Sequence, residues 1–301
     1  AFMWNVMSFE GIWFPTIGID EICNRLKDSI NDNGGVIKLL NGVSRLKIKN
    51  DKVSSVITNS DDAYQGDWVV ANADYKTTFL NLIGQDQIDN DFFEKIDKTP
   101  YTGSELCVYL GIEPSKVDLS KMRATHMFYR ALMDDKSTNE PTNFKNKEIE
   151  ACLWSNKSPR FVPEGKKSLI LRVNMPYDLF EEWRTGEKKR KQGYKQFKTD
   201  LAWKLIGVME KPLPGLSSAI ETIEIATPLT YRDWGKRHRG SVAGWSRDIK
   251  KIQIQSKLLC RTPIQNLFMV GIYSVIEPFL GGVPVSVYTG NLVADHLLNL
   301  E

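Results

Sequence analysis

The chain of 301 residues carries 40 lysines and arginines against 37 aspartates and glutamates, so its formal net charge is +3. Hydrophobic residues make up 42% of it and aromatic residues 10%, which is the composition of a folded globular protein and excludes disordered, collagen-like and disulfide-scaffold classes. The length suits about two domains. The near balance of charge gives no reason to expect nucleic acid as a partner.

The four cysteines are scattered, with no C-x-x-C pair and no histidine within four residues of any of them: Cys23, Cys107, Cys152 and Cys260. This spacing does not predict a zinc site, so no metal is expected. Nothing suggests a disulfide framework, which favours the reducing cytoplasm.

The first elements form a compact α/β pattern. Residues 18–33 predict a helix with one buried face, because apolar residues recur at spacings of three and four, and Gly34-Gly35 ends it. The apolar run 36–40 predicts a strand. Residues 45–49 and 53–58 alternate around a turn and predict a hairpin.

Residues 67–74 predict a buried strand that ends in small and polar residues. Strand ends of this kind commonly face a ligand in α/β sheets. In the middle of the chain, apolar runs are separated by polar loops, which favours antiparallel strands. The expected strands are residues 104–112, 148–154, 168–173 and 219–225.

A long helix is predicted over residues 178–208. Its charged run 187–191 favours a solvated face, and contact with an anionic membrane surface is the alternative. The α/β character then returns with a strand at 267–270 and a helix at 283–300. We therefore expect a domain of residues 1–80, a second domain at 81–247, and a return to the first at 248–301.

The segment between the last strand and the last helix predicts a ligand site. Gly271 allows the strand end to approach a ligand, and Gly281 with Gly282 leaves space where a flat ring could lie on the backbone. Pro284 suits a first helical turn. The helix start would stabilise negative charge on a reduced flavin. The alternative is a purely structural loop.

Five motifs occur in a fixed order: residues 11–18 (GIWFPTIG), 35–43, 67–74 (DWVVANAD), 226–230 (ATPLT) and 281–284 (GGVP). In this order and spacing the chain resembles the phytoene desaturase, carotenoid isomerase and retinol saturase family of flavoproteins. The resemblance covers nearly the whole chain, but only the C-terminal two thirds of such a protein.

The resemblance implies an α/β (α+β) fold in which a partial FAD-binding Rossmann-like domain is interrupted by a substrate domain of antiparallel sheet plus helix. It also implies an FAD-dependent oxidoreductase that transfers hydride between flavin and a long, apolar isoprenoid or polyene. No catalytic acid or base is assigned, because the cofactor supplies the difficult step.

The family opens with a strand, G-x-G-x-x-G and a helix that hold the FAD pyrophosphate, and that pattern occurs nowhere in this chain. We expect the chain to be a fragment whose partner is the missing N-terminal FAD-binding segment. The alternatives are a pyrophosphate cradle supplied otherwise, or loss of cofactor binding.

The resemblance also assigns individual residues. For Val43, the alternative to cofactor contact is a plain core valine. For Asp74, the alternative is a helix N-cap. The positions matching the cofactor-lining motifs are Val43, Asn72, Ala73, Asp74, Gly271, Gly281, Gly282, Val283 and Pro284. The positions expected to contact substrate are Trp13, Phe14, Tyr231, Trp245 and Phe279.

A non-catalytic reading remains open. Prenyl-protein escort proteins share this general fold without flavin chemistry, so a prenyl- or lipid-binding module is the alternative function. A flavoprotein acting on another substrate, such as an amine, is a close relative of the first hypothesis. In each case the expected location is the cytoplasm, with peripheral membrane association as an addition.

Overall fold

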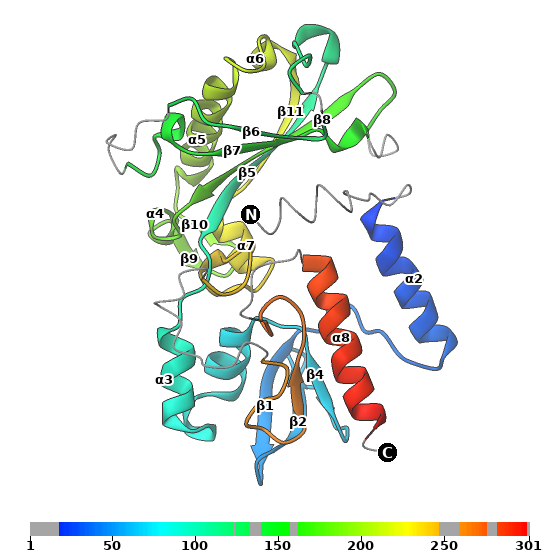
Figure 1. Cartoon of the computed structure of the whole chain (residues 1–301). Helices are drawn as coiled ribbons and strands as arrows, with labels where there is room; N and C mark the ends of the chain where they lie inside the picture. The colour runs from blue at the N-terminus through cyan, green and yellow to red at the C-terminus, as the bar shows by residue number, and fades with distance from the viewer. Residues whose placement is uncertain are drawn as a thin grey trace. The chain divides into compact units, whose positions relative to one another are not determined.

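The computed structural model describes residues 18–122, 124–132, 140–156, 162–246, 259–275 and 282–299. The chain divides into two compact units, each built from two stretches of sequence. The first unit comprises residues 1–37 and 104–234, and the second comprises residues 38–103 and 235–301. Figure 1 labels most of the helices and strands of both units.

The first unit is built on a five-stranded antiparallel sheet with the strand order β11-β5-β8-β7-β6. Its longest strands alternate: Leu106, Val108 and Leu110 are buried on one face, and the residues between them point to the other. The strands are β5 (Ser104–Ile112), β6 (His126–Tyr129), β7 (Ile149–Cys152), β8 (Lys167–Met175) and β11 (Ile220–Ala226).

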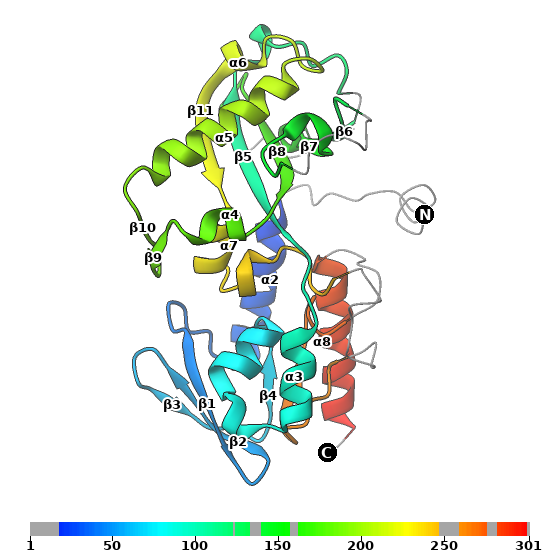
Figure 2. The same ribbon diagram turned by 90° about the vertical axis from the view of Figure 1, so that its left-hand side faces the viewer.

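One long helix, α5 (Tyr194–Met209), covers the buried face of this sheet (Figure 2). Leu205, Ile206 and Met209 are fully buried against the strands, and burial of each such side chain contributes about 1.5 to 3 kcal/mol. The shorter elements of this unit are α4 (Asp178–Glu181), α6 (Leu216–Ala219), α7 (Pro228–Asp233), β9 (Arg184–Gly186), β10 (Lys189–Arg190), η3 (Pro114–Lys116), η4 (Phe144–Asn146) and η5 (Trp154–Asn156).

The single helix predicted over residues 178–208 is wrong. The chain instead forms α4, the small hairpin β9–β10, and then α5. The charged run lies in that hairpin, where Lys188 adopts a positive φ of 57°. Asp233 accepts hydrogen bonds from the Lys188 backbone N–H at 2.9 Å and from Arg190 Nη1 at 2.7 Å, and these contacts favour the turn over a continuous helix.

Helix α2 (Ile19–Asp32) forms where it was predicted, with Asn33 as its C-cap, but the buried face predicted for it is wrong. None of its residues is buried, so the apolar stripe lies exposed, with Leu26 59% exposed and Ile30 46%. The strand predicted at 36–40 is wrong: in this stretch Leu39 and Leu40 are exposed and no strand pairs with it. Apolar composition alone cannot form a strand without a partner.

The second unit begins with the predicted hairpin. Strands β1 (Val43–Lys49) and β2 (Lys52–Thr58) are antiparallel, and β3 (Ala63–Tyr64) adds to the edge of β2. Asn50 and Asp51 both have positive φ, at 53° and 57°, the geometry that two-residue hairpin turns require.

A parallel pair of strands completes the second unit. In β4 (Val69–Ala71) and β12 (Leu267–Met269), Val69 lies opposite Leu267. The Asn266 side chain holds β2 beside this pair, because its Oδ1 accepts from the Val53 N–H at 2.7 Å and its Nδ2 donates to the Val53 carbonyl at 3.0 Å. The remaining elements are η1 (Thr77–Ile83), η2 (Gln85–Gln87), α3 (Asn90–Lys98), η7 (His238–Gly240) and α8 (Gly282–Leu298).

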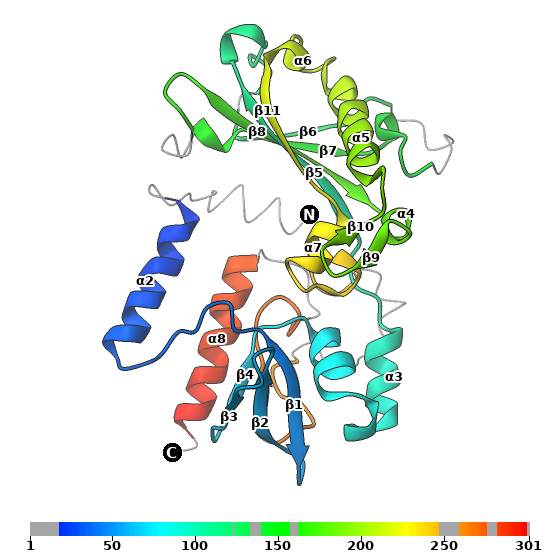
Figure 3. The ribbon, with the colours of Figure 1, turned by 180° about the vertical axis from the view of Figure 1, so that it is seen from behind.

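Figures 1 and 3 both show α8 alongside β4. Figure 3 presents the three-stranded sheet toward the viewer, with α8 to its left and α3 to its right. The core of this unit gathers buried residues from β1, β2, η1, α3 and β12, among them Leu46, Phe79 and Ile96. Among the described helices, none has the length and apolar character needed to span a bilayer.

Candidate functional site

The predicted cofactor wall lies in the second unit, where β4 and β12 end. Both parallel strands finish at the same edge, so Asn72 directly follows β4 and Gly271 follows β12 by two residues. Gly271 has a φ of 85°, and a Cβ built on it would overlap Asn72 Oδ1. Only glycine therefore lets the two strand ends approach so closely.

Helix α8 is fastened to the same edge. The Gly271 N–H donates to Thr289 Oγ1 at 2.8 Å, and that hydroxyl donates to the Val285 carbonyl at 2.8 Å. Thr289 is fully buried. The glycine at the strand end is thus tied to the second turn of the helix, and α8 begins at Gly282 near Ile272.

The exposed positions at this edge are small or apolar. Asn72 and Ala73 are exposed after β4, and Val283 and Pro284 are exposed in the first turn of α8. Gly282 is half-buried. The start of a 17-residue helix carries about half a positive charge. The edge therefore combines small or apolar exposed side chains with the positive start of a helix.

Asp74 is buried and has a structural part in this unit. Its Oδ1 accepts from the Thr77 N–H at 2.8 Å, which is an N-cap bond, and from the Tyr101 hydroxyl at 3.1 Å. Its Oδ2 accepts from the His238 N–H at 2.9 Å. Burial, followed by the charge of Asp74, raises the pKa of Tyr101 well above its usual value.

Two further predicted residues lie elsewhere in the second unit. Val43 is the first residue of β1 and is 41% exposed. Trp245 is buried, donates from Nε1 to the Tyr273 carbonyl at 2.7 Å, and packs edge-on against Tyr101 with ring centroids 4.6 Å apart. Trp13, Phe14, Phe279 and Gly281 lie outside the described residues.

The last predicted position, Tyr231, belongs to α7 in the first unit. Its hydroxyl donates to Glu105 Oε1 at 2.6 Å, and Glu105 accepts from Arg172 Nη2 at 2.8 Å. Arg172 also donates from Nη1 to Glu150 Oε2 at 2.9 Å. Burial, followed by the charge of Glu105, raises the pKa of Tyr231, so this phenol stays protonated.

This network of hydrogen bonds lies on the face of the sheet that α5 does not cover. Cys107, Arg172 and Glu150 are direct cross-strand neighbours on that face. The network extends to His126, whose Nδ1 lies 2.8 Å from Glu150 Oε1. We refer to Glu105, Cys107, Arg172, Glu150 and His126 with their neighbours on this side as the open face.

Sequence analysis missed the open face. Two signals could have found it: the acidic Glu105 alternates with buried leucines and valines in β5, and Arg172 interrupts the apolar run of β8. A charged residue in such a strand needs partners across the sheet. Pairing could not be deduced from spacing, because Glu105 and Arg172 are 67 positions apart.

No family model matches the chain. Curated relatives do match it, among them the following three. All-trans-retinol 13,14-reductase of Danio rerio is 22% identical over 314 residues, covering 97% of this chain and 51% of the relative. Phytoene desaturase (lycopene-forming) of Pseudescherichia vulneris is 25% identical over 242 residues, covering 77% and 45%. Chloroplastic prolycopene isomerase of Arabidopsis thaliana is 25% identical over 268 residues, covering 87% and 42%.

The resemblance predicted from the motifs is confirmed. The chain spans about half the length of the relatives it matches, and not the two thirds expected from the motifs.

Solved structures extend the likeness to the fold. A putrescine oxidase variant from a redesign of cofactor binding superposes with a TM-score of 0.61 at 12% identity, covering 94% of this chain and 53% of the other. An oxidoreductase from Methanosarcina mazei gives a TM-score of 0.57 at 14% identity, covering 91% and 54%. The predicted fold class, with a Rossmann-like part and an antiparallel sheet, is confirmed.

Proposed function

We propose that the chain is part of an FAD-dependent oxidoreductase of the phytoene desaturase and retinol reductase type, acting on a long apolar isoprenoid or polyene. The observation that carries the proposal is the edge formed by Asn72, Gly271 and the start of α8. These residues are far apart in sequence and were assigned to one cofactor wall by the motif order.

The residues at this edge fit a flavin. Gly271 keeps a side chain away from the strand ends, and Ala73 and Gly282 leave the backbone accessible. FAD would supply hydride transfer at its ring when bound. The protein's part is to hold the ring on the strand ends and to present positive charge from the start of α8. Asp74 fixes the segment after β4 through its N-cap bond to Thr77.

A further segment would complete this wall. Parallel strands occur almost only where both faces are covered, yet Val70 in β4 is 48% exposed and the neighbouring Trp68 is 41% exposed. On α8, Val283, Val287 and Tyr288 are 47%, 54% and 59% exposed. This apolar surface suits the N-terminal segment with the strand, G-x-G-x-x-G and helix that hold pyrophosphate in the family.

The open face of the five-stranded sheet supplies the substrate platform in this proposal. Tyr109 and Phe128 are 42% and 56% exposed on it, and their rings would pack against an isoprenoid chain. Each buried CH2 of such a chain contributes about 0.8 kcal/mol. Tyr231 is held by Glu105 at a fixed position on this face. Its role is orientation of the substrate.

The test is purification of the gene product read from its own start codon, followed by its visible spectrum and assays with all-trans-retinol, phytoene and prolycopene. We expect bound flavin and conversion of at least one of these polyenes. Absence of flavin together with absence of any conversion contradicts the proposal.

The same preparation separates the non-catalytic alternative. Tight binding of a prenylated peptide, with no flavin bound and no response to added FAD, would identify an escort-type module instead. Conversion of an amine with no polyene turnover would retain the flavoprotein assignment and replace the substrate class.

A further inference from the structure

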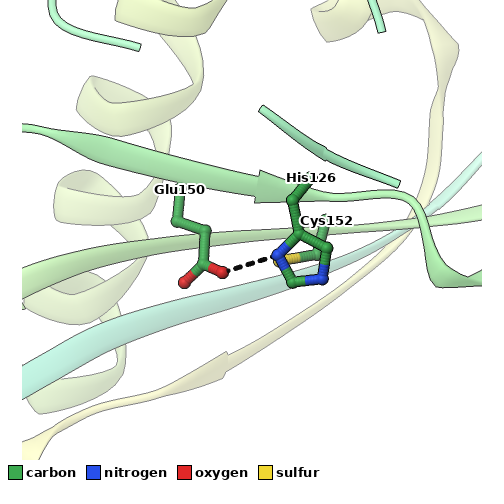
Figure 4. A group of neighbouring side chains, drawn as sticks. All are labelled: His126, Glu150 and Cys152. Atoms are coloured by element: carbon green, nitrogen blue, oxygen red, sulfur yellow. Dashed lines mark hydrogen bonds and ion pairs between the residues drawn. The ribbon is translucent and has the colours of Figure 1, made fainter. Parts of the chain in front are cut away.

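Three side chains with different donor atoms meet on the open face, at the edge of the five-stranded sheet (Figure 4). His126 Nδ1 lies 2.8 Å from Glu150 Oε1 and 3.6 Å from Cys152 Sγ. The three donor atoms all lie within 4.8 Å of one another. His126 and Glu150 are partly buried, and Cys152 is buried.

The sheet itself fixes this arrangement. His126 in β6 is the direct cross-strand partner of Cys152 in β7, and Glu150 precedes Cys152 by two residues, so all three side chains point to one face. Sequence spacing predicts no metal site because His126 and Cys152 are 26 positions apart. Antiparallel pairing of β6 with β7 brings the two residues together in space.

The carboxylate of Glu150 is oriented by a hydrogen bond from Arg172. Arg172 Nη1 donates to Glu150 Oε2 at 2.9 Å and leaves Oε1 toward the other two donors. Arg172 is in turn held by Glu105, whose Oε2 accepts from Nη2 at 2.8 Å. Such outer contacts are typical of metal-binding carboxylates, because they fix the ligand before the ion arrives.

We propose that His126, Glu150 and Cys152 bind one divalent transition-metal ion of borderline softness, with Zn²⁺ as the best match. Zn²⁺ takes imidazole nitrogen, carboxylate oxygen and thiolate sulfur, and a site with three protein ligands leaves a fourth position for water or another ligand. Glu105 and Glu150 carry two negative charges against one positive charge on Arg172. A Cys152 thiolate adds a third, so a divalent cation neutralises the group.

The hydrogen bond from Trp154 to His126 competes with metal binding, and removing it should change the measured affinity for the ion. Its Nε1–H donates to His126 Nε2 at 2.9 Å, so the imidazole proton lies on Nδ1 and points to Glu150. Metal binding at Nδ1 moves that proton to Nε2 and releases the thiol proton of Cys152 to solvent. The indole of Trp154, 45% exposed, must then give up its hydrogen bond.

The experiment is a Co²⁺ titration of the reduced, chelator-treated chain, carried out in a Cys23→Ser background because Cys23 is exposed. We expect one equivalent to bind, with a thiolate-to-cobalt charge-transfer band that added Zn²⁺ removes. Cys152→Ser should abolish the band, and His126→Gln should weaken binding more than about 10-fold. Trp154→Phe should strengthen binding, because it removes the competing donor.

Cys107→Ser is the matched control, since Cys107 is a buried thiol on the same face and is not one of the three donors. It should keep the band. Absence of stoichiometric binding to the folded chain, or a band that survives Cys152→Ser, overturns the proposal. Should Cys152→Ser fail to fold, an unchanged or weakened affinity in Trp154→Phe, which alters no ligand, contradicts it independently.

Discussion

The five-stranded sheet of the first unit and the parallel pair of the second use apolar residues differently. The sheet buries most of one face under α5 and its neighbours, and on the other face Glu105, Arg172 and Glu150 are paired with one another. The β4–β12 pair is two strands wide and leaves Val70 exposed beside an α8 whose Val287 is also exposed. The charged residues on the sheet of the first unit are therefore paired within that sheet, whereas the parallel pair of the second unit leaves apolar side chains exposed, where we propose that a further segment packs.

This difference concerns the function directly. In our proposal the substrate platform lies on one antiparallel sheet, and all five of its strands belong to this chain. A dinucleotide site of the Rossmann kind is assembled from parallel strands and helices that come from distant parts of a sequence. In this proposal, a chain that spans about half the length of its relatives holds the platform and one wall of the cofactor site.

The largest effect on unfolding free energy is expected from removing a buried ion pair within the first unit. Asp233 is buried and accepts from Arg184 Nε at 3.0 Å and from Arg190 Nη1 at 2.7 Å. Asp233→Asn leaves both arginines without a counter-charge and should lower the free energy of unfolding by about 3 kcal/mol. Urea unfolding of the chain measures the loss.

Glu221→Gln is the control for that change. Glu221 pairs with Lys166 at 2.6 Å, but its side chain is 45% exposed, so the loss should be below about 1 kcal/mol. Equal effects of the two substitutions would mean that the buried pair does not stabilise the first unit.

A smaller effect is expected at the strand ends of the second unit. Gly271→Ala forces a side chain into a φ of 85° and against Asn72, at a cost of about 1 to 2 kcal/mol in unfolding free energy. In the flavin-bearing protein it should also lower flavin content, because the added methyl group occupies the proposed wall.

Gly290→Ala provides the matched control in α8. A Cβ at Gly290 meets nothing within 4 Å, and its φ is not positive, so alanine should stabilise the helix by up to about 1 kcal/mol. A neutral Gly271→Ala, with flavin content unchanged, would contradict the close approach of the two strand ends.

The exposed surface of the second unit gives a third and weaker test. Val287→Lys should change the unfolding free energy of this chain by less than about 0.5 kcal/mol, since Val287 is exposed. It should reduce concentration-dependent association in light scattering, because it places charge in an apolar patch.

Gln196→Lys adds the same charge to an exposed position of α5 in the first unit. It should leave association unchanged. If both lysines reduce association equally, net charge and not the apolar patch of α8 is responsible, and the contrast between the units loses this support.

Local pattern predicted most of the antiparallel sheet. β5 has the predicted bounds, and the β1–β2 hairpin forms around Asn50 and Asp51, because alternation and turn residues are local signals. The helix over 178–208 was wrong because Asp233, far along the chain, binds Arg184 and Arg190 and stabilises a hairpin there. Tertiary contacts of this kind leave no periodicity in the sequence.

The candidate site was predictable in part for the same reason. The family resemblance implied that Asn72 and Gly271 lie close together, because it assigned both to the cofactor. In the structure they meet because the parallel strands β4 and β12 end at one edge. The pairing of Glu105 with Arg172 did not follow, because it depends on the register between β5 and β8. Whether any of the predicted site residues contacts a ligand stays a prediction.

The smallest expected effect concerns pH and sharpens the test of Asp233. Burial alone would raise the pKa of Asp233, but hydrogen bonds from Arg190, the Lys188 N–H and Arg184 outweigh it and hold the pKa below its usual value. A depressed folded pKa means that this contribution is fully present above the unfolded value of about 3.9 and is lost as pH falls through the folded value. The difference in unfolding free energy between the wild type and Asp233→Asn should therefore be constant near neutral pH and narrow only below about pH 4. A difference that instead narrows above that pH would show that another group, and not the Asp233 carboxylate, controls the acid sensitivity of the first unit.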